Sequence, residues 1–550
     1  MSRTDATAQP RSTEDALLQP ALQAARAGDM AEAKRLARRA IAGGGQHPAL
    51  FNLRAMDHED NGRLDEALAD LTRASELGPG DYSVLNALGL CLGRLGRPEE
   101  AVGRFEAALA LRDDFAPAWF NLGGALEQLG ETARAVNAYA KAAELAPGNA
   151  LAWSNLAWLA ARRGDRAAAE SYARRALALR PGLPAAILTL AAVDEERPLA
   201  AEAMLRGLIG RPDIGAQEQA LALGQLGDAL DAQDRPHEAF EAYATGNAIA
   251  RDEARPRFES PGRPTVQTTL AWLVPWAEAL NAGVWRAGAE VAAEPGPPAA
   301  HVFLLGFPRS GTTLIESALA AHPDVVSLEE RNSLTAAARD FTSDAAALSR
   351  LANAGPADLA FYRADYWQRV MASGVELAGK VFIDKNPFNT LRLPLIARLF
   401  PRARIIFAVR DPRDVVLSCF RRRFNLNPST YELLDLRRAA AFYDGAMTFA
   451  EVMTPKLGLA GRRLIYERLV ADFEGEARAV CAFIGVEWRP DLADFAGRAR
   501  RGDVASASAA QIARGLYADG AGQWRRYRGE LAPVLPVLAP WVRTFGYDPE

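Results

Sequence analysis

The chain has 550 residues, of which 49% are hydrophobic, and a formal net charge of -4 at pH 7. The length suggests about three to four domains of roughly 150 residues, and the small net charge gives no indication that the whole chain binds nucleic acid. Its three cysteines, Cys91, Cys419 and Cys481, lack the spacing of metal ligands. We therefore interpret them as small buried residues of a protein from a reducing compartment.

The first 20 residues are polar and mixed in charge, without the apolar core of a signal peptide. No window of the sequence approaches the roughly 18 uninterrupted apolar residues of a membrane span. We expect a soluble, cytoplasmic protein with no membrane span, in which residues 1–20 form a flexible N-terminus.

Residues recur at an interval of 34 in the first half of the chain. The recurring sets are Gly62, Gly96, Gly130 and Gly164; Ala67, Ala101, Ala135 and Ala169; Ala74, Ala108, Ala142 and Ala176; and Leu77, Leu111, Leu145 and Leu179. This unit resembles the tetratricopeptide repeat, a helix–turn–helix. The glycine would end the first helix in a left-handed conformation, and the alanines would let paired helices approach closely. The pattern predicts an all-α solenoid over residues 21–250, with degenerate units at both ends that cap the stack.

Large apolar residues keep the same period, and we expect Trp119, Trp153, Leu122 and Leu156 to be core residues. The inner, concave face of such a solenoid often binds a peptide or protein partner. After residue 250 the period is lost, and prolines punctuate residues 251–299. We interpret this stretch as a helical linker, with a largely helical part at 268–287.

The second half alternates short apolar runs with amphipathic segments. Strands are predicted at 302–305, 325–327, 381–384, 404–409 and 463–466. Helices are predicted at 312–321, from 333, and at 392–400, 412–422 and 474–484. This alternation is typical of an α/β domain with a parallel sheet covered by helices on both faces, here over residues 300–550.

The first of these strands leads into a glycine-containing loop. Gly306 and Gly311 have the spacing of a P-loop, but Thr312 stands where a P-loop has its lysine. The backbone N–H groups of such a loop form an anion site at a helix N-terminus, and Arg309 would supply the positive charge. The loop is therefore P-loop-like, and it suits a phosphate-like group on something other than ATP-Mg.

A second anion site is predicted after the strand at 404–409. Arg410 and Asp411 would emerge at its carboxyl end, and Ser418 and Arg422 would share one face of the following helix. Arg410, Arg413, Ser418 and Arg422 could then converge on one anion. The alternative is that the arginines at 421–423 form a solvated face. Two anion sites at two strand ends indicate a nucleotide with separated phosphates.

At this point several segments together carry a family resemblance. They read, in order, FPRSGTT, AHPDVVSLEER, DKNPF, ARLFPRARIIFAVRDPRDVVLS, LIYERLV and GQWRRY. Residues 302–527 resemble the sulfotransferases that use 3'-phosphoadenosine-5'-phosphosulfate. They are most similar to the protein-tyrosine branch and its bacterial relatives fused to tetratricopeptide repeats.

The resemblance implies roles for individual residues. The 5'-phosphosulfate would be held by Arg309, Ser310, Gly311, Thr312 and Thr313. Other nucleotide contacts would come from Arg410 and Ser418 at the 3'-phosphate, helped by Arg422, and from Tyr466. Ser508 and Arg514 match a late segment that closes over the cofactor, where the protein-tyrosine branch has lysine in place of Arg514.

The resemblance also places Glu330 at the catalytic base and Lys385 at the lysine that stabilises the transferring group. Sulfuryl transfer needs positive charge at the transferring and leaving groups, which Arg309, Lys385 and the helix N-terminus could supply without a metal. It also needs one base to take the acceptor's proton. Glu329 is the rival candidate, and either glutamate could instead be a capping or salt-bridge carboxylate.

The remaining candidates have structural interpretations. We expect His322 to be a helix-end or packing residue, and Asp384 and Asp411 to orient neighbouring basic residues. The predicted function is sulfuryl transfer to a hydroxyl or tyrosine of a protein, glycan or small molecule, with the repeats recruiting substrate or partner. The alternatives are a P-loop-like nucleotide kinase or hydrolase, and a repeat scaffold with an inactive transferase domain.

Overall fold

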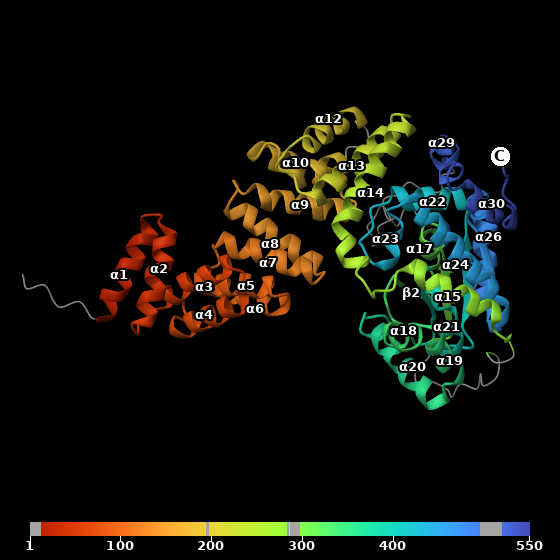
Figure 1. Cartoon of the computed structure of the whole chain (residues 1–550), viewed down its shortest axis with the longest axis horizontal. Coiled ribbons are helices and arrows are strands. Elements are labelled where there is room, and N and C mark those ends of the chain that lie inside the picture. Colours follow the sequence, from red (N-terminus) through yellow and green to blue (C-terminus); the bar gives the residue numbers. More distant parts are fainter. Residues whose placement is uncertain (1–12, 194–196, 283–284, 286–297, 495–519) are drawn as a thin grey trace, which may run out of the picture. The chain divides into compact units, whose positions relative to one another are not determined.

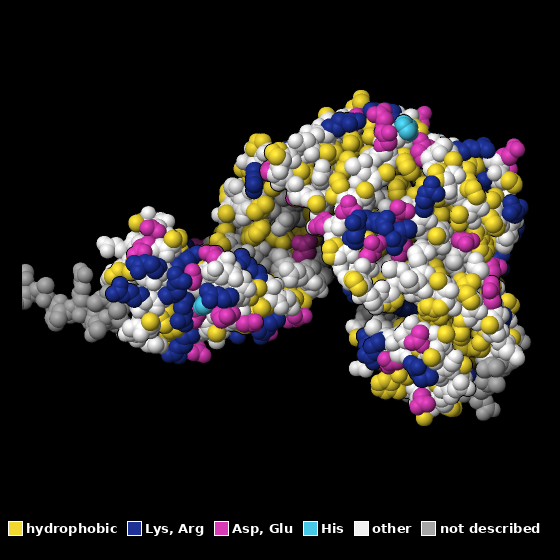
Figure 2. Space-filling model, viewed as in Figure 1, with side chains coloured by type: hydrophobic (Ala, Val, Ile, Leu, Met, Phe, Trp, Pro, Cys, Tyr) yellow, Lys and Arg dark blue, Asp and Glu magenta, His cyan; other side chains and the backbone are white. Residues whose placement is uncertain are grey.

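A computed structural model describes residues 13–193, 197–282, 285, 298–494 and 520–550. The chain divides into two compact units, Met1–Val193 and Asp194–Glu550 (Figure 1). No helix in the described ranges has both the length and the apolar character needed to cross a membrane. Basic and acidic side chains are intermixed on the face shown in Figure 2, in keeping with the small net charge.

The first unit consists of antiparallel helix pairs at the predicted interval. The helices are α1 Thr13–Arg26, α2 Met30–Ala42, α3 Pro48–Asp60, α4 Leu64–Leu77, α5 Tyr82–Arg94, α6 Pro98–Leu111, α7 Ala116–Gln128, α8 Thr132–Leu145, α9 Ala150–Arg162, α10 Arg166–Leu179 and α11 Pro184–Val193. Gly62, Gly96, Gly130 and Gly164 have φ between 71° and 78°, as expected for glycines that end a helix. The eight alanines of the two recurring sets have no exposed surface. The all-α repeat architecture is therefore confirmed.

The recurring tryptophans differ from the expectation. Leu122 and Leu156 are buried, at 5% and 3% exposure, but Trp119 and Trp153 are only half-buried against the edge of the core. Each indole donates its Nε1–H to a carbonyl of the turn before its helix, Asp113 O at 2.7 Å and Pro147 O at 3.0 Å. These polar contacts keep the ring edge at the surface, because the Nε1–H needs an acceptor.

The second unit begins with four more helices: α12 Pro198–Ile209, α13 Ala216–Asp231, α14 Pro236–Phe258 and α15 Val266–Ala279. Helix α15 lies inside the stretch that we expected to be a linker. Its residues Val266, Leu270, Leu273 and Ala277 are buried in the same core cluster as the α/β domain, where α15 packs against α24 (Leu436–Leu457).

The α/β domain is built on five parallel strands. They are β1 Ala300–Gly306, β2 Val325–Glu329, β3 Val381–Lys385, β4 Arg404–Val409 and β5 Ala460–Ile465, in the order β2-β3-β1-β4-β5. The other elements are α17 Thr312–Leu319, α18 Thr335–Phe341, α19 Ala345–Asn353, α20 Pro356–Met371, η1 Pro387–Arg392, α21 Leu393–Leu399, α22 Pro412–Arg421, α23 Pro428–Glu432, α25 Tyr466–Ala471, α26 Phe473–Ile484, η2 Pro490–Asp494, η4 Gln523–Tyr527, α29 Arg528–Leu531 and α30 Leu535–Thr544.

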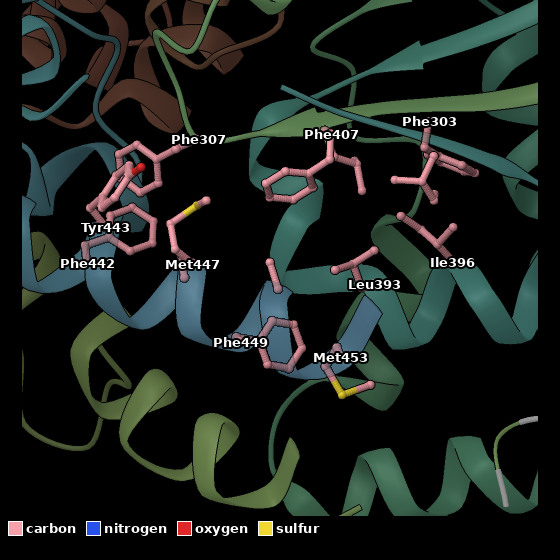
Figure 3. Packing of buried hydrophobic residues seen from close by; sticks show 14 of the residues in the cluster. Phe303, Phe307, Leu393, Ile396, Phe407, Phe442, Tyr443, Met447, Phe449 and Met453 are labelled. Atoms are coloured by element: carbon pink, nitrogen blue, oxygen red, sulfur yellow. The ribbon is translucent and has the colours of Figure 1, made fainter. Parts of the chain in front are cut away.

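Each face of the sheet has its own core, because successive side chains of a strand point to opposite faces. On one face, Phe303 and Phe407 pack with residues of α21 and α24, among them Ile396, Met447 and Phe449 (Figure 3). On the other face, Val302, Leu304 and Ile406 pack with residues of α17 and α26. The predicted coverage of both faces is confirmed.

Some element boundaries differ from the prediction. Strand β5 lies at Ala460–Ile465, and Tyr466 begins helix α25 instead of ending the strand. The helix expected at 392–400 is α21, and an unpredicted 3-10 turn at Pro387–Arg392 precedes it. Helices α20 and α24 were not predicted individually. Both are long, and α24 is buried along much of its length, so its apolar residues do not alternate with polar ones in a clear helical period.

Candidate functional site

All five strands end at one edge of the sheet, and each end contributes a residue of the candidate site. Glu329 and Lys385 are the last residues of β2 and β3, and the loop after Gly306 follows β1. Arg410 and Tyr466 come directly after β4 and β5. Ligands of open α/β sheets bind at this edge, where the strand order reverses.

The loop between β1 and α17 has an unusual backbone. Arg309 and Gly311 both have left-handed φ values, 70° and 92°, and Gly311 is the N-cap of α17 without a side-chain capping bond. A Cβ atom on Gly306 would lie 2.6 Å from the carbonyl oxygen of Ala408, and one on Gly311 would lie 2.4 Å from Cδ2 of Tyr466. Both glycines are therefore required by the close approach of Ala408 in β4 and Tyr466 after β5.

The loop is joined to the end of β4 by two arginines. Arg309 Nε donates to Ser418 Oγ on α22 at 3.1 Å, and Arg410 Nη1 donates to the carbonyl oxygen of Arg309 at 3.0 Å. The Arg410 guanidinium also donates to Gly520 O and lies 4.9 Å from the centre of the Tyr466 ring. The structure thus brings together four of the predicted nucleotide contacts: Arg309, Arg410, Ser418 and Tyr466.

One polar atom in this cluster lacks a partner. Arg410 is 8% exposed, and its Nε is buried with no hydrogen-bond acceptor among the described residues. A buried donor without a partner is costly, so this atom marks a place where an anionic group would be stabilised. Burial raises the pKa of the Tyr466 hydroxyl, as does Glu467, although Arg410 and Arg309 act in the opposite direction. Tyr466 is therefore a neutral phenol over which a ligand could pack.

Lys385 lies among three carboxylates and has no exposed surface. Its Nζ is 2.8 Å from Glu329 Oε1, 3.0 Å from Glu330 Oε1 and 3.2 Å from Glu316 Oε2. Glu330 has a left-handed φ of 48°, and its N–H donates to Lys385 O at 2.7 Å. The strained backbone turns Glu330 back over the end of β3, and its side chain stays 59% exposed.

Burial sets the protonation of this cluster. Burial alone would lower the pKa of Lys385, but the three carboxylates, Glu316 first, raise it above its ordinary value, so the lysine is charged. Burial raises the pKa of Glu316 to about 7; Lys385 opposes this shift and Glu329 adds to it. Glu316 is thus the carboxylate of the cluster that takes up a proton near neutrality. Its Oε1 accepts from Ser327 Oγ at 2.5 Å.

Two expectations about neighbouring charges are wrong. Arg413 does not face an anion site: it forms a double hydrogen bond with Asp411, at 3.0 and 2.8 Å, and stacks 3.7 Å from the Trp524 ring centre. Asp384 is not hydrogen-bonded to a basic residue: its Oδ2 accepts from Tyr366 OH at 2.8 Å, and burial raises its pKa to about 7, against the opposing effects of Tyr366 and the Arg392 charge. The pairing of Asp411 with a neighbouring basic residue is confirmed.

Other expectations have mixed outcomes. His322 is a helix-end residue as predicted, since its ring nitrogens contact Glu487 O at 3.0 Å and the Asp324 N–H at 3.1 Å. Arg421 and Arg423 do not form a solvated face, because they pair with Asp231 and Asp228. Arg422 follows α22 as its C-cap, and burial lowers its pKa. Ser508 and Arg514 lie outside the described residues.

Sequence reasoning missed three residues that shape the site. Glu316 contacts Lys385, Thr390 Oγ1 binds both the N–H and the C=O of Gly306, and Asp414 accepts from the N–H groups of Gly522 and Trp524. Glu316 lies four residues after Thr312, on the first helix turns after the loop, and this spacing was the available signal. The other two act on backbone groups, which leave no trace in residue spacing.

The chain is similar to known proteins in two separate regions. A model of the sulfotransferase family matches residues 301–490, and tetratricopeptide-repeat models match residues 46–114, 86–150 and 125–184. Protein-tyrosine sulfotransferase A of Caenorhabditis elegans is 24% identical over 45% of this chain and 67% of its own length. Protein-tyrosine sulfotransferase 1 of Danio rerio is 27% identical over 45% and 72%.

A longer match is an uncharacterized protein of Aquifex aeolicus, 24% identical over 63% of this chain and 45% of its own length. This chain therefore spans less than half of that relative. The family matches coincide with the two architectures described above, namely helix pairs in the first half and a parallel sheet with a P-loop-like edge in the second. The chain carries tetratricopeptide repeats followed by a domain of the sulfotransferase family.

Proposed function

We propose that the C-terminal domain transfers a sulfuryl group from 3'-phosphoadenosine-5'-phosphosulfate to a hydroxyl or tyrosine acceptor. The observation that carries this proposal is the meeting of Arg309, Arg410, Lys385 and Glu330 at one edge of the sheet. The family match supports transferase chemistry. The donor, the residue roles and the acceptor class are our inference.

The loop after β1 suits the 5'-phosphosulfate. It combines a glycine N-cap without side-chain capping, which leaves backbone N–H groups for an anion, with the positive end of the α17 dipole. Arg309, Ser310, Gly311, Thr312 and Thr313 would bind this group. Thr312 in the lysine position disfavours an ATP-Mg site, which would need both the lysine and a magnesium ligand.

The end of β4 suits the 3'-phosphate. The unpartnered Nε of Arg410 is buried there near the Tyr466 ring, and Arg309 links Arg410 to Ser418. A phosphate would satisfy this donor, and charge-assisted hydrogen bonds of this kind are stronger than neutral ones. Arg422 at the end of the same helix would add positive charge, and Tyr466 would contact the nucleotide.

Catalysis would use the carboxylate and lysine pair beside the loop. Glu330 is the more exposed of the two candidate bases, with 59% of its side chain accessible against 34% for Glu329, so an acceptor hydroxyl can reach it. By taking the proton of this hydroxyl, Glu330 would make the acceptor oxygen a stronger nucleophile. Lys385 is fully buried and charged, so it would stabilise the negative charge of the transferring group.

The repeats would recruit the acceptor or a partner protein. In the first unit, Met56, Leu90 and Trp158 occupy equivalent positions of α3, α5 and α9, in register with the 34-residue repeat, and are 37%, 41% and 49% exposed. The equivalent position of α7 is Gly124, so the exposed apolar side chains lie on three of these four first helices, and such side chains favour binding of a peptide or protein segment.

Calorimetric titration with adenosine 3',5'-bisphosphate tests the donor assignment. We expect the full chain to bind the bisphosphate and to show no saturable heat with ATP-Mg. Arg410→Ala should weaken binding by roughly 10- to 100-fold, the value of a hydrogen bond to a charged group. Saturable binding of ATP-Mg without binding of the bisphosphate would contradict the proposal and indicate a kinase or hydrolase.

A further inference from the structure

The end of helix α22 is held by a helix pair that the sequence pattern assigns to the repeat array. Helices α13 and α14 precede the α/β domain in the chain, yet both belong to its compact unit, and α14 lies beside α22 and α23 (Figure 1). Asn247 of α14 is buried and donates its Nδ2–H to Phe420 O at 2.8 Å. The ring of Phe240 stacks on that of Phe420, with centroids 5.2 Å apart. A carbonyl in the last turn of α22 is thus satisfied from α14.

Two aspartates of α13 hold the arginines on either side of Arg422. Asp231 pairs with Arg421 and Asp228 Oδ2 pairs with Arg423 Nη2. The Arg421 guanidinium also lies 5.4 Å from the ring centre of Tyr243 on α14. Both neighbours of Arg422, the C-cap of α22, are thus tied to carboxylates of α13.

Small residues of the helix pair make room for these contacts. A Cβ atom on Gly224 of α13 would lie 2.8 Å from Cδ of Arg423, and one on Gly227 would lie 2.4 Å from the Tyr243 ring. A Cβ atom on Gly246 of α14 would lie 2.9 Å from the carbonyl oxygen of Ala220 on α13. Glycine inside a helix costs about 1 kcal/mol relative to alanine, so these three glycines are explained by the close packing of α13 on α14 and, at Gly224, on Arg423.

Asp231 also binds a second segment of the α/β domain. Its Oδ1 accepts from Tyr527 OH at 2.6 Å and from Arg526 Nη1 at 2.8 Å. Both residues belong to η4, whose Trp524 N–H donates to Asp414 of α22, and Gly520 shortly before η4 accepts from Arg410. A single carboxylate, 13% exposed, therefore connects two segments 100 residues apart that both reach the predicted 3'-phosphate site.

We propose that the α13–α14 pair is a positioning element of the donor site, with Asp231 as its central residue. By joining Arg421 to Arg526 and Tyr527, Asp231 sets where the end of α22 and Arg410 present their donors to the nucleotide. Asp231 does not touch the nucleotide itself; it acts through Arg421 and Tyr527. This inference rests on the proposed function for the identity of the ligand.

The test uses full-length Asp231→Asn, with Glu238→Gln as the matched control. Glu238 is on α14 and pairs only with Arg235 and Arg206 among the described residues, so its loss leaves the α/β domain untouched. We expect Asp231→Asn to raise the Kd for adenosine 3',5'-bisphosphate by roughly tenfold or more, because small displacements of positioned groups cost this much. At saturating donor, kcat should change much less, and Glu238→Gln should change neither.

Hydrogen exchange gives a readout that does not depend on any ligand. Asp231→Asn should accelerate amide exchange in both 412–423 and 520–527, while the first unit is unchanged. If Asp231→Asn lowers Tm but leaves exchange in these segments and the bisphosphate Kd at wild-type values, the inference is wrong. If Asp231→Asn accelerates exchange in both segments but the wild-type protein does not bind the bisphosphate, the positioning role stands and the proposed donor is wrong.

Asp228→Asn is the alternative test variant if Asp231→Asn does not fold. It removes the charge that holds Arg423 and leaves the Asp231 contacts in place. We expect faster exchange in 412–423 alone and a smaller rise in Kd. Unchanged exchange in that segment would overturn the inference independently of the first variant.

Discussion

Lys385 Nζ lies 3.0 Å from Oε1 of Glu330 and 2.8 Å from Oε1 of Glu329, so one buried lysine contacts both candidate bases. The two glutamates differ in backbone and in exposure. Glu329 is the last residue of β2, whereas Glu330 has left the strand in a left-handed conformation. Strain of this kind at a candidate site is often linked to function, and it favours Glu330 as the residue that meets the acceptor.

Replacing each glutamate separately distinguishes their roles. We expect Glu330→Gln to lower kcat by about 100-fold or more, the contribution of a positioned base, while the Kd for adenosine 3',5'-bisphosphate stays near wild type. Glu329→Gln should have a smaller effect on kcat, because it removes only one of three carboxylates around Lys385. Rapid-quench measurement of sulfuryl transfer from labelled donor gives both values. A larger loss of kcat for Glu329→Gln than for Glu330→Gln would identify Glu329 as the base.

Stability should depend on pH through Glu316. Its pKa is raised from 4.5 in the unfolded chain to about 7 in the folded protein, chiefly by burial. The folded state therefore binds the proton more tightly, and its stability falls as pH rises from about 4.5 to about 7, by at most about 3 kcal/mol from this group. The loss is complete above the folded pKa.

Glu316→Gln removes this titration, so the variant should lose less stability than wild type between pH 5 and pH 8. Urea unfolding at a series of pH values measures the difference between the two slopes. Asp384, also buried with a pKa of about 7, contributes the same sign in both proteins and cancels in the comparison. Parallel slopes for the variant and wild type would show that Glu316 is ionised throughout.

Gly311 should tolerate no side chain. Its φ of 92° is unfavourable for other residues, and a Cβ atom there would strike the Tyr466 ring at 2.4 Å. We expect Gly311→Ala to weaken bisphosphate binding at least tenfold, because loop and ring both contribute to the proposed site. Gly485→Ala is the matched control: φ is 91°, but its Cβ would meet only the end of the Arg404 side chain, at 3.0 Å.

Both glycine variants should lose about 1 kcal/mol or more of stability through backbone strain, which thermal unfolding measures. Only the Gly311 variant should also lose binding, as measured by calorimetry. Equal bisphosphate affinity in the two variants would mean that the loop does not contact the nucleotide.

The sequence was sufficient for those parts of the molecule that follow from periodicity. The 34-residue interval predicted the helix pairs and the left-handed Gly62 and Gly164, and the apolar runs predicted all five strands to within a few residues. The alternation of strands also placed Arg309 and Arg410 at one sheet edge, because the carboxyl ends of parallel strands meet there.

Contacts between segments distant in the chain could not be predicted. Arg413 follows Arg410 by three residues and carries the same charge, but only the fold shows that its partner is Asp411 and that Trp524 covers it. Likewise, Arg421 and Arg423 resemble an exposed basic face until α13 places aspartates opposite them. Spacing identifies which residues share an element, and tertiary packing decides which of them are neutralised.

The Arg413–Asp411 pair should be structural, and it can be compared with an exposed pair of the same spacing. Arg413 and Asp411 have side chains 4% and 9% exposed, whereas Arg489 and Asp491 are 49% and 60% exposed. Removing one partner of a buried pair leaves an uncompensated charge and costs about 3–5 kcal/mol. Removing one partner of an exposed pair has little effect on stability, because solvent screens the interaction.

We therefore expect Arg413→Ala to be strongly destabilised in urea unfolding and Arg489→Ala to be close to wild type. Arg413 also donates to the carbonyls of Asp548 and Pro549, so the C-terminal residues should exchange faster in its variant. At a temperature where both variants are folded, each should retain the bisphosphate affinity of wild type. If folded Arg413→Ala loses bisphosphate affinity without losing stability, Arg413 contributes to the anion site and its structural role is wrong.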